Sequence, residues 1–343
     1  MTTLAFQWWY RFIRATAVHV RSRRRIFGLL LALACAPIAS QQTSGSSATA
    51  FAIQSSPIVF AIIGDFGHSP QARRKYGEWA IDPPGDVARL VKSWEPEFIV
   101  TTGDNNYYCG DADTIDDNIG QYYHAFMAPY LGKYGRGATE NRFFPSIGNH
   151  DWYAGAGCQP ASSAAPYIAY FPSLPGNGRY YDFVRGAVHI FVLSSDLDSE
   201  HDGVTASSTQ GLWLQSALAS SQSPWKLVVF HHPPFSSGIC CGDIRLESDW
   251  MRWPFQAWGA SAVVAGHSHS YERIMITGFP YFVNGAGGHG TTPFETNPSP
   301  GTVVRYNDDL GAMRVIADQA TLSFEFINRS GELIDLFKLP SGL

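Results

Sequence analysis

The 343-residue sequence predicts an α/β layered fold, and three features of the chain support this prediction. Apolar residues make up 45% of the chain and aromatic residues 14%, which is enough to bury a sizeable core and excludes disorder over most of the length. Short apolar runs recur, and each of them stops at a polar cluster. Helical patterns lie between these runs, and strands that alternate with helices are typical of layered α/β proteins.

The predicted strands are short runs of β-branched and aromatic residues bounded by glycine or proline. Five of them end at polar clusters: Ile58 to Ile63 at Gly64-Asp65-Phe66-Gly67, Phe98 to Thr102 at Gly103-Asp104-Asn105-Asn106-Tyr107, Phe143 to Ile147 at Gly148-Asn149-His150-Asp151, Leu227 to Phe230 at His231-His232-Pro233, and Ala262 to Ala265 at Gly266-His267-Ser268-His269. Because the ends of such strands converge on one edge of a sheet, we expect the five clusters to form one site.

Three segments between these strands have helical patterns: Asp86 to Val91, Gly211 to Leu218 and Ser248 to Trp258. The C-terminal runs, Met313 to Ala317, Leu322 to Phe326 and Leu333 to Leu339, are predicted to be antiparallel strands that complete a sheet. No linker, charge run or clear internal repeat interrupts the chain after residue 57, so we expect a single domain over residues 57–343.

Residues 1–40 are predicted to be a signal peptide. A cluster of arginines, Arg21 and Arg23 to Arg25, precedes an apolar run from Ile26 to Ala36, and small residues follow it, as in a secretory signal. The run is shorter than the ~20 residues that span a membrane. Arg24-Arg25-Ile26-Phe27 also resembles a twin-arginine signal, so both export routes stay open. We expect a secreted or periplasmic protein with a flexible segment over residues 41–56 and no stable membrane span in the mature chain.

The net charge of −5 at pH 7 argues against a nucleic-acid binder, which usually has a basic face. A small anionic substrate is still compatible with this charge, because a bound metal can supply local positive charge. Nothing in the sequence points to an obligate protein partner.

The five polar clusters are weak evidence singly, because an aspartate after a glycine is most often part of a turn. Together they place two aspartates, an asparagine, three histidines and a tyrosine at strand ends. Carboxylate and amide oxygens mixed with imidazoles suit iron, zinc or manganese better than calcium alone. One carboxylate can bridge two ions about 3.5–4 Å apart, which is the arrangement used for in-line displacement at phosphorus.

The ordered motifs Gly-Asp-x-Gly, Gly-Asp-x-x-Tyr, Gly-Asn-His-Asp, Val-x-x-His and Gly-His-x-His resemble those of the metallophosphoesterases, and specifically the purple acid phosphatases. The resemblance runs from Ile58 to the C-terminus and lacks the extra N-terminal β-domain of the larger plant enzymes, so the chain resembles the small tartrate-resistant type. It implies a four-layer sandwich of two mixed β-sheets flanked by helices, with two metals at the strand ends. Tyr107, three residues after Asp104, is the residue that distinguishes the purple enzymes within this superfamily.

The resemblance implies two metal sites that share one carboxylate. It places Asp65, Asp104, Tyr107 and His269 around a ferric ion, and Asp104, Asn149, His231 and His267 around a divalent ion of iron, zinc or manganese. A phenolate and carboxylates would neutralise the trivalent ion, while an amide and imidazoles suit the softer divalent one.

The implied function is a secreted acid phosphatase that hydrolyses small phosphate monoesters through attack of a metal-bound hydroxide on phosphorus. His150 is the expected proton donor to the leaving oxygen, with Asp151 orienting its ring; a hydrogen-bonding role behind the ligands is the alternative for His150. Two other functions fit the same residues. One is a phosphodiesterase or nucleotide hydrolase, and the other is a non-catalytic iron-binding or redox protein.

The chain departs from the family pattern beside the Val-x-x-His motif. The family usually has one or two histidines about nine positions after that histidine, lining the substrate pocket, and here Cys240 and Cys241 occupy the place. Because a thiol pair cannot copy a cationic imidazole, we expect substrate choice, pH optimum or leaving-group protonation to differ.

Three further features lie near the predicted site. His232 is interpreted as a structural neighbour of His231, and His68 as a histidine that could reach the mouth of the site. The glycine-rich segment from Gly285 to Gly290 lacks the Lys-Ser/Thr ending of a phosphate-binding loop and is interpreted as a tight turn beside the site.

Four cysteines remain after the signal peptide, namely Cys109, Cys158, Cys240 and Cys241, and three full disulfide connectivities are possible. Pairing of Cys109 with Cys158 is favoured, because both follow motifs of the predicted site, whereas geometry disfavours a bridge between adjacent cysteines. Metal ligation by thiols is the alternative, and the lack of a Cys-x2-Cys pair argues against a structural zinc site.

Overall fold

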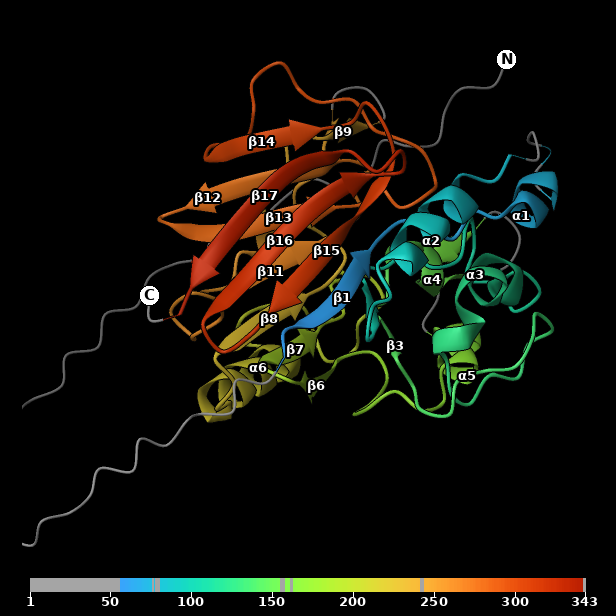
Figure 1. The fold of residues 1–343 in the computed structure, drawn as a ribbon, viewed down its shortest axis with the longest axis horizontal. Coiled ribbons are helices and arrows are strands. Elements are labelled where there is room, and N and C mark those ends of the chain that lie inside the picture. The colour runs from blue at the N-terminus through green and yellow to red at the C-terminus, as the bar shows by residue number, and fades with distance from the viewer. Residues whose placement is uncertain are drawn as a thin grey trace, which may run out of the picture. The chain divides into compact units, whose positions relative to one another are not determined.

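Two mixed β-sheets form the centre of the protein in the computed structural model, which describes residues 56–75, 77, 81–154, 158–160, 163–240 and 244–341 (Figure 1). The predicted signal peptide and the segment that follows it up to residue 55 lie outside the described residues, as does Cys241. The described residues belong to one compact unit. Among them there is no helix with the length and apolar character needed to cross a membrane.

The first sheet has the strand order β17-β16-β15-β1-β2-β3. The bounds of its strands are β1 Ile58–Ile63, β2 Ile99–Thr101, β3 Phe143–Pro145, β15 Gly311–Ala317, β16 Thr321–Asn328 and β17 Leu333–Pro340. Strands β1, β2 and β3 are parallel, while β15, β16 and β17 are antiparallel, as the sequence predicts for the tail. β1 pairs with β15, so the blue first strand lies beside the orange-red β15 near the C-terminus (Figure 1).

The second sheet has the strand order β14-β12-β13-β11-β8-β7-β6. Its bounds are β6 Tyr181–Arg185, β7 Val188–Val192, β8 Trp225–Val229, β11 Ala262–Ala265, β12 Tyr271–Ile276, β13 Phe279–Asn284 and β14 Thr302–Tyr306. The four central strands β7, β8, β11 and β13 are parallel. Two short hairpins lie outside the sheets, formed by β4 Tyr153–Ala154 with β5 Gln159–Pro160 and by β9 Ile239–Cys240 with β10 Ile244–Arg245.

The helices are short. The α-helices are α1 Pro70–Lys75, α2 Pro83–Ser93, α3 Gln121–Tyr123, α4 Asn149–Trp152, α5 Ala165–Tyr170 and α6 Thr209–Ser220; a π-helix covers Asp116–Gly120, and 3-10 turns cover His124–Phe126 and Asp249–Met251. The two longest begin at capping side chains: Asp82 accepts a hydrogen bond from the Gly85 N–H (3.0 Å), and Ser208 accepts one from the Gly211 N–H (3.2 Å).

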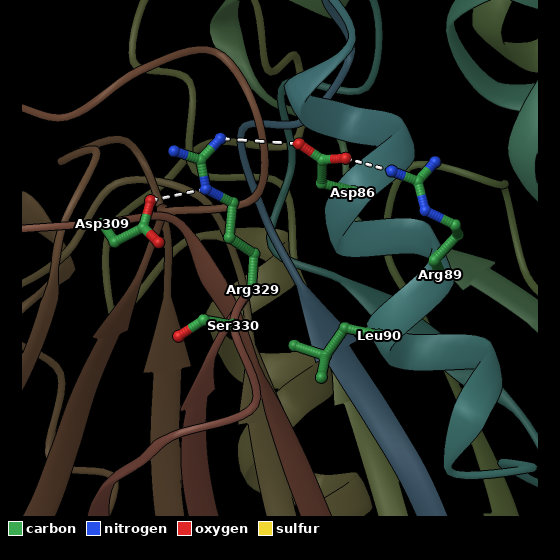
Figure 2. A pocket seen from close by; sticks show the side chains of 6 residues that line it. All are labelled: Asp86, Arg89, Leu90, Asp309, Arg329 and Ser330. Carbon is green, nitrogen blue, oxygen red and sulfur yellow. Dashed lines mark hydrogen bonds and ion pairs between the residues drawn. The ribbon is translucent and has the colours of Figure 1, made fainter.

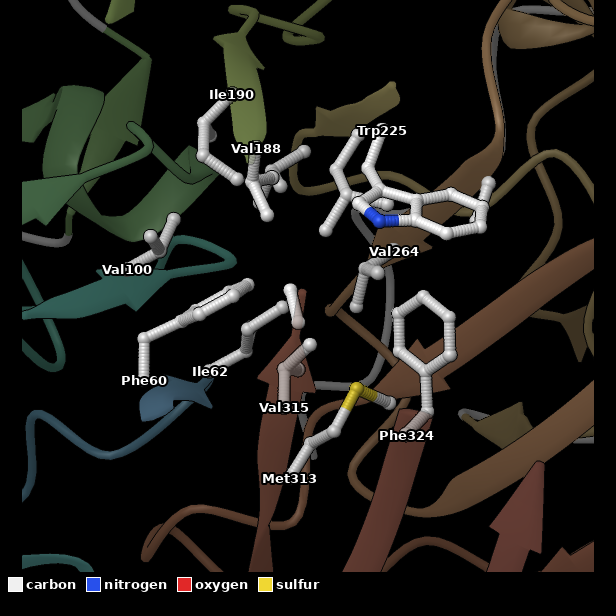
Figure 3. Close-up of a cluster of buried hydrophobic side chains, with 14 of the residues drawn as sticks. Phe60, Ile62, Val100, Val188, Ile190, Trp225, Val264, Met313, Val315 and Phe324 are labelled. Atoms are coloured by element: carbon white, nitrogen blue, oxygen red, sulfur yellow. The ribbon is translucent and has the colours of Figure 1, made fainter. Parts of the chain in front are cut away.

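Three hydrophobic clusters define the layers. The cluster between the sheets joins β1, β2 and the C-terminal strands to β7, β8 and β11, with Phe60, Ile62 and Met313 on one side and Val188 and Trp225 on the other (Figure 3). A second cluster packs α2 and α3 on the outer face of the first sheet. A third packs α6 on the outer face of the second sheet. The predicted sandwich of two mixed sheets flanked by helices is therefore confirmed.

Ion pairs join α2 to the loops at the end of the first sheet (Figure 2). Arg329 lies 2.6 Å from Asp309 and 3.6 Å from Asp86, which also pairs with Arg89. These residues, with Leu90 and Ser330, line a pocket of about 310 Å³. Both arginines are paired with carboxylates, and none of the candidate metal ligands lines the pocket.

The predicted strand and helix positions agree with the structure except at one segment. β1 and β11 have the predicted bounds, and the other predicted strands differ by a few residues at their ends. The predicted helix over Ser248–Trp258 is wrong, because only Asp249–Met251 forms a helical turn. Pro254 disfavours helical backbone at Trp253, and the Trp253 indole instead donates hydrogen bonds to the carbonyls of Trp250 (2.8 Å) and Val204 (3.1 Å).

Candidate metal centre

The seven predicted metal ligands lie at the ends of five strands. Asp65 follows β1, Asp104 and Tyr107 follow β2, Asn149 follows β3, His231 follows β8, and His267 and His269 follow β11. Strands β1, β2 and β3 are parallel neighbours, and so are β8 and β11. The carboxyl ends of each parallel set therefore lie on one edge, and side chains from both sheets meet there.

The first half of the site is arranged around the phenol of Tyr107, which is 1% exposed. Its hydroxyl donates to Asp104 Oδ2 at 2.8 Å and lies 3.2 Å from Asp65 Oδ1 and 3.2 Å from His269 Nε2. His269 Nε2 in turn lies 3.4 Å from Asp65 Oδ1. The four side chains assigned by resemblance to the ferric ion are thus in mutual contact.

The second half is arranged around His231, which is fully buried. Its Nε2 lies 2.9 Å from Asn149 Oδ1, 3.2 Å from His267 Nδ1 and 3.4 Å from Asp104 Oδ2. Its Nδ1 lies 2.9 Å from the Thr102 carbonyl oxygen, which can only accept a hydrogen bond, so Nδ1 carries the proton and Nε2 is left for a ligand. Asp104 contacts both halves.

The backbone at three of the candidate ligands is left-handed. The φ angles are +56° at Asp65, +51° at Asp104 and +68° at His267. Such angles are uncommon for residues other than glycine and concentrate at functional sites. They are held by contacts within the site, because the His267 N–H donates to the Asp65 carboxylate at 3.0 Å. At Gly103 a Cβ would lie 2.6 Å from His231 Nδ1, so only glycine permits this approach.

The charges of the cluster favour a bound cation. Asp65 and Asp104 are 0% and 1% exposed, and among the described residues neither forms an ion pair with lysine or arginine. Burial by itself would raise the pKa of Asp104, yet the imidazoles of His231 and His150 hold it well below its usual range. Burial by itself would lower the pKa of His231, but the charge on Asp104 outweighs this effect and raises the pKa to about 9. One protonated imidazole thus balances buried carboxylates, and a metal ion can replace that proton.

Tyr107 and His267 have properties that suit metal ligation. Burial, Asp104 and Asp65 raise the pKa of Tyr107 well above its usual range, so this phenol keeps its proton until a cation arrives. Burial and the charge on His231 lower the pKa of His267 to about 3, so this imidazole is neutral and available as a ligand. The donor set of carboxylates, phenol, amide and imidazoles therefore fits two metal ions.

His150 lies beside the cluster at the start of α4. Its backbone N–H donates to Asp104 Oδ1 (2.9 Å), its ring Nδ1 lies 2.7 Å from the Tyr108 carbonyl oxygen, and its Nε2 lies 3.9 Å from Asp104 Oδ2. The side chain is 26% exposed, so it borders both the cluster and solvent. Because Nδ1 donates to a carbonyl, Nε2 is the ring nitrogen nearer to the Asp104 carboxylate.

The expected contact of Asp151 with the His150 ring is wrong. The Asp151 carboxylate accepts hydrogen bonds from the Gly148 N–H (2.9 Å), the Asn105 N–H (3.1 Å) and the Asn105 Nδ2 (2.8 Å). It therefore fixes the loop that carries Asp104, while the Tyr108 carbonyl orients the His150 ring. Burial and the charge on Asp104 raise the pKa of Asp151 to about 7.

Two residues of the site were missed by the sequence analysis. Asn105 is fully buried and joins Asp151 to Thr101 Oγ1 (2.6 Å) and to the Ser146 carbonyl (2.8 Å); its position directly after Asp104 was the available signal. His289 lies in the glycine-rich segment that was interpreted as a turn, and its ring centre is 4.2 Å from that of Tyr107.

The remaining histidines and the cysteines also have defined places. His68 is 1% exposed, so it lies behind the site and does not open to its mouth. The His232 Nδ1 contacts Ser195 Oγ (3.0 Å), and its ring packs 4.6 Å from that of His267; a nitrogen of His232 also lies within 4.8 Å of nitrogens of His231 and His267, so its purely structural role stays a prediction. Cys109 and Cys158 form the favoured disulfide. Cys240 is the last residue of β9. The segment just before β9 is held by a hydrogen bond from the Ser237 N–H to the buried carboxylate of Glu272 (2.7 Å).

A fold of two mixed sheets with buried carboxylates and imidazoles gathered at the strand ends defines the class of metal-dependent phosphoesterases. The chain belongs to the calcineurin-like phosphoesterase family, whose sequence model matches residues 58–271. The family model and the phosphatase relatives support a hydrolase that acts on phosphate esters, and they imply a binuclear metal centre.

The resemblance to purple acid phosphatases is also confirmed. The chain is 24% identical to tartrate-resistant acid phosphatase type 5 of Rattus norvegicus over 306 residues, which cover 83% of this chain and 91% of that protein. It is 24% identical to the purple acid phosphatase of Glycine max over 227 residues, 63% of this chain and 44% of that protein. A solved purple acid phosphatase from yellow lupin (Lupinus luteus) superposes with a TM-score of 0.64 at 17% identity, over 84% of this chain and 54% of that one.

We expect Asp104→Asn to lower the metal content at both positions, because this carboxylate contacts both halves of the cluster. Hydrolysis of phosphate esters should fall roughly a thousandfold, since charge stabilisation by metals contributes several kcal/mol. Elemental analysis and turnover check this. Asp335→Asn is the matched control, because Asp335 is a buried carboxylate that pairs with Arg273 and Tyr271 instead. Full metal content and activity in Asp104→Asn would contradict the assignment.

Proposed function

We propose that the chain is an exported acid phosphatase that hydrolyses phosphate monoesters with a ferric and a divalent ion. The observation that carries the proposal is the position of the Tyr107 hydroxyl, within 3.2 Å of Asp65, Asp104 and His269. The names of the mammalian and plant relatives, acid phosphatase and purple acid phosphatase, agree with it.

The two halves of the cluster differ in the charge that they can offer. Asp65, Asp104 and a deprotonated Tyr107 would together carry enough negative charge to neutralise a ferric ion. His267, Asn149 and His231, once a metal ion has replaced its extra proton, are neutral ligands. The shared carboxylate of Asp104 is then the negatively charged ligand of this half, which suits iron, zinc or manganese in the divalent state. Bound at these positions, the two ions would supply an activated water and offset the charge of the phosphate during displacement.

The chain's own residues provide the remaining functions. His150 is proposed to protonate the leaving oxygen, because its ring is held by the Tyr108 carbonyl, partly exposed, and next to Asp104. Asp151 and Asn105 hold the Asp104 loop, so their contribution is to position the shared ligand. The left-handed backbone at Asp65 and Asp104 preorganises both carboxylates before substrate binds.

The protein purified with its metals should be coloured, because a phenolate bound to a ferric ion absorbs in the middle of the visible range. We expect Tyr107→Phe to lose this band, and absorption spectra together with iron analysis check it. Tyr123→Phe is a matched control, because Tyr123 is an equally buried tyrosine whose hydroxyl has no hydrogen-bond partner among the described residues. A colourless wild-type protein with two divalent ions would rule out the ferric assignment.

Monoester specificity is tested by comparing kcat/KM for an aryl phosphate monoester with that for the corresponding bis-aryl diester. We expect the monoester to be preferred, and His231→Ala to abolish turnover of both. A preference for the diester would favour the phosphodiesterase alternative. A fully metallated protein with no turnover of either substrate would favour the non-catalytic iron-binding or redox alternative.

Export is supported by the sequence pattern of residues 1–40 and by the Cys109–Cys158 disulfide, since disulfides persist mainly in oxidising compartments. We expect the mature protein outside the cytoplasm to begin after this segment, which N-terminal sequencing checks.

The Cys109–Cys158 disulfide closes a separation of 49 residues, so Cys109→Ser should lower the free energy of unfolding by about 4 kcal/mol. Cys240→Ser, which leaves the disulfide intact, is the control; equal losses in both variants would contradict a stabilising bridge.

A further inference from the structure

Four aromatic rings follow one another beside the predicted ferric half of the site: His68, His289, Tyr107 and His150. The ring centres of His68 and His289 are 4.7 Å apart with the planes inclined by 19°, so these two imidazoles are stacked. The His289 ring is 4.2 Å from Tyr107, and the Tyr107 ring is 4.5 Å from His150. We refer to these four residues as the ring row.

The loop that carries His289 is hydrogen bonded to the loop that carries Asp65. The Gly287 N–H donates to the Gly64 carbonyl (2.9 Å), and the His289 N–H donates to the Asp65 carbonyl (3.0 Å). A Cβ at Gly285 would lie 2.2 Å from the Ser268 carbonyl oxygen, so this glycine lets the loop approach the His267–His269 segment as well. The backbone of the His289 segment therefore lies against two of the three ligand-bearing loops of the ferric half, the one with Asp65 and the one with His269.

Arg73 and His68 also contact the segment that carries His289. The buried Arg73 guanidinium donates to the Gly288 carbonyl (3.5 Å) and the His289 carbonyl (3.4 Å). His68, which is 1% exposed, stacks on the His289 ring. The His289 ring therefore has little freedom to turn away from Tyr107.

His289 itself has no ligand geometry. Its Nε2 is buried and has no hydrogen-bond partner among the described residues, and it does not belong to the groups of His and Asp side chains whose ligand atoms converge. Its side chain contacts the site through the ring, which lies 4.2 Å from the Tyr107 ring and 4.8 Å from the His269 ring.

We infer that His289 is a positioning residue for the phosphatase reaction, because its ring holds the Tyr107 phenol in place between itself and His150. This inference rests on the proposed function, since it assigns Tyr107 as a metal ligand and His150 as the proton donor. Any displacement of the Tyr107 ring would shift its oxygen relative to Asp65, Asp104 and His269. It would also remove the surface on which the His150 ring rests.

The test compares His289→Ala, which removes the ring, with His289→Phe, which keeps a ring of similar size without nitrogens. In the metal-loaded full-length mature protein, His289→Ala should shift the visible absorption maximum and lower kcat roughly tenfold or more with KM little changed, because small misplacements act mainly on the chemical step. His289→Phe should restore the wild-type band and most of kcat. If His289→Ala does not fold, His289→Gln, which also lacks a ring, carries the same prediction.

His189→Ala is the matched control, because His189 is similarly buried, packs on Phe191 and pairs with Asp182 (2.7 Å) and Ser221 (2.9 Å), away from the cluster. It should lower stability without moving the band or kcat. A wild-type band and kcat in His289→Ala would overturn the inference, and so would a His289→Phe variant that behaves like His289→Ala. A wild-type protein that is active but colourless would refute the ferric assignment instead, and kcat and metal retention in the same variants would then decide the role of His289.

Discussion

The rest of the site depends on two buried carboxylates that lack a permanent cationic partner. Asp65 and Asp104 lie at the ends of neighbouring parallel strands, in left-handed backbone conformations, and among the described residues only histidines face them as bases. Burying such charges is costly unless they are paired or coordinate metals. The parallel pairing of β1 and β2, the glycine before Asp104 and the proton held by His231 all serve this one requirement, and a bound metal pair satisfies it most completely.

Sequence patterns predicted this site well because its ligands are local to strand ends. An apolar run followed by glycine and a polar residue determines both where the strand stops and where the ligand lies, so β1 and β11 were placed to the residue and all seven predicted ligands meet in one cluster. The Cys109–Cys158 pair was favoured for the same reason, because both cysteines follow ligand-bearing loops. The order of strand, glycine and polar residue along the sequence was therefore enough to predict the ligands and the disulfide.

The sequence was insufficient where a contact depends on tertiary packing. The apolar spacing of Ser248–Trp258 is helical, but Pro254 and the indole hydrogen bonds of Trp253 produce an irregular buried segment. Asp151 follows His150 directly, yet its carboxylate faces Asn105 across the site. His289 is separated from Tyr107 by more than half of the described chain, and it is brought there by tertiary contacts such as the hydrogen bonds from the Gly287 and His289 N–H groups to the Gly64 and Asp65 carbonyls.

These contacts make the ligands, the proton donor and their supports one coupled unit. Asp104 Oδ2 accepts from the Tyr107 hydroxyl, while Asp104 Oδ1 accepts from the His150 backbone N–H. Tyr107 in turn packs against His150 and His289. A change at any of these residues moves the others, so the effects of single substitutions will not add. The contribution of the ring row can be separated from that of the shared carboxylate only by a double-mutant cycle, in which the coupling between His289 and Asp104 is measured directly.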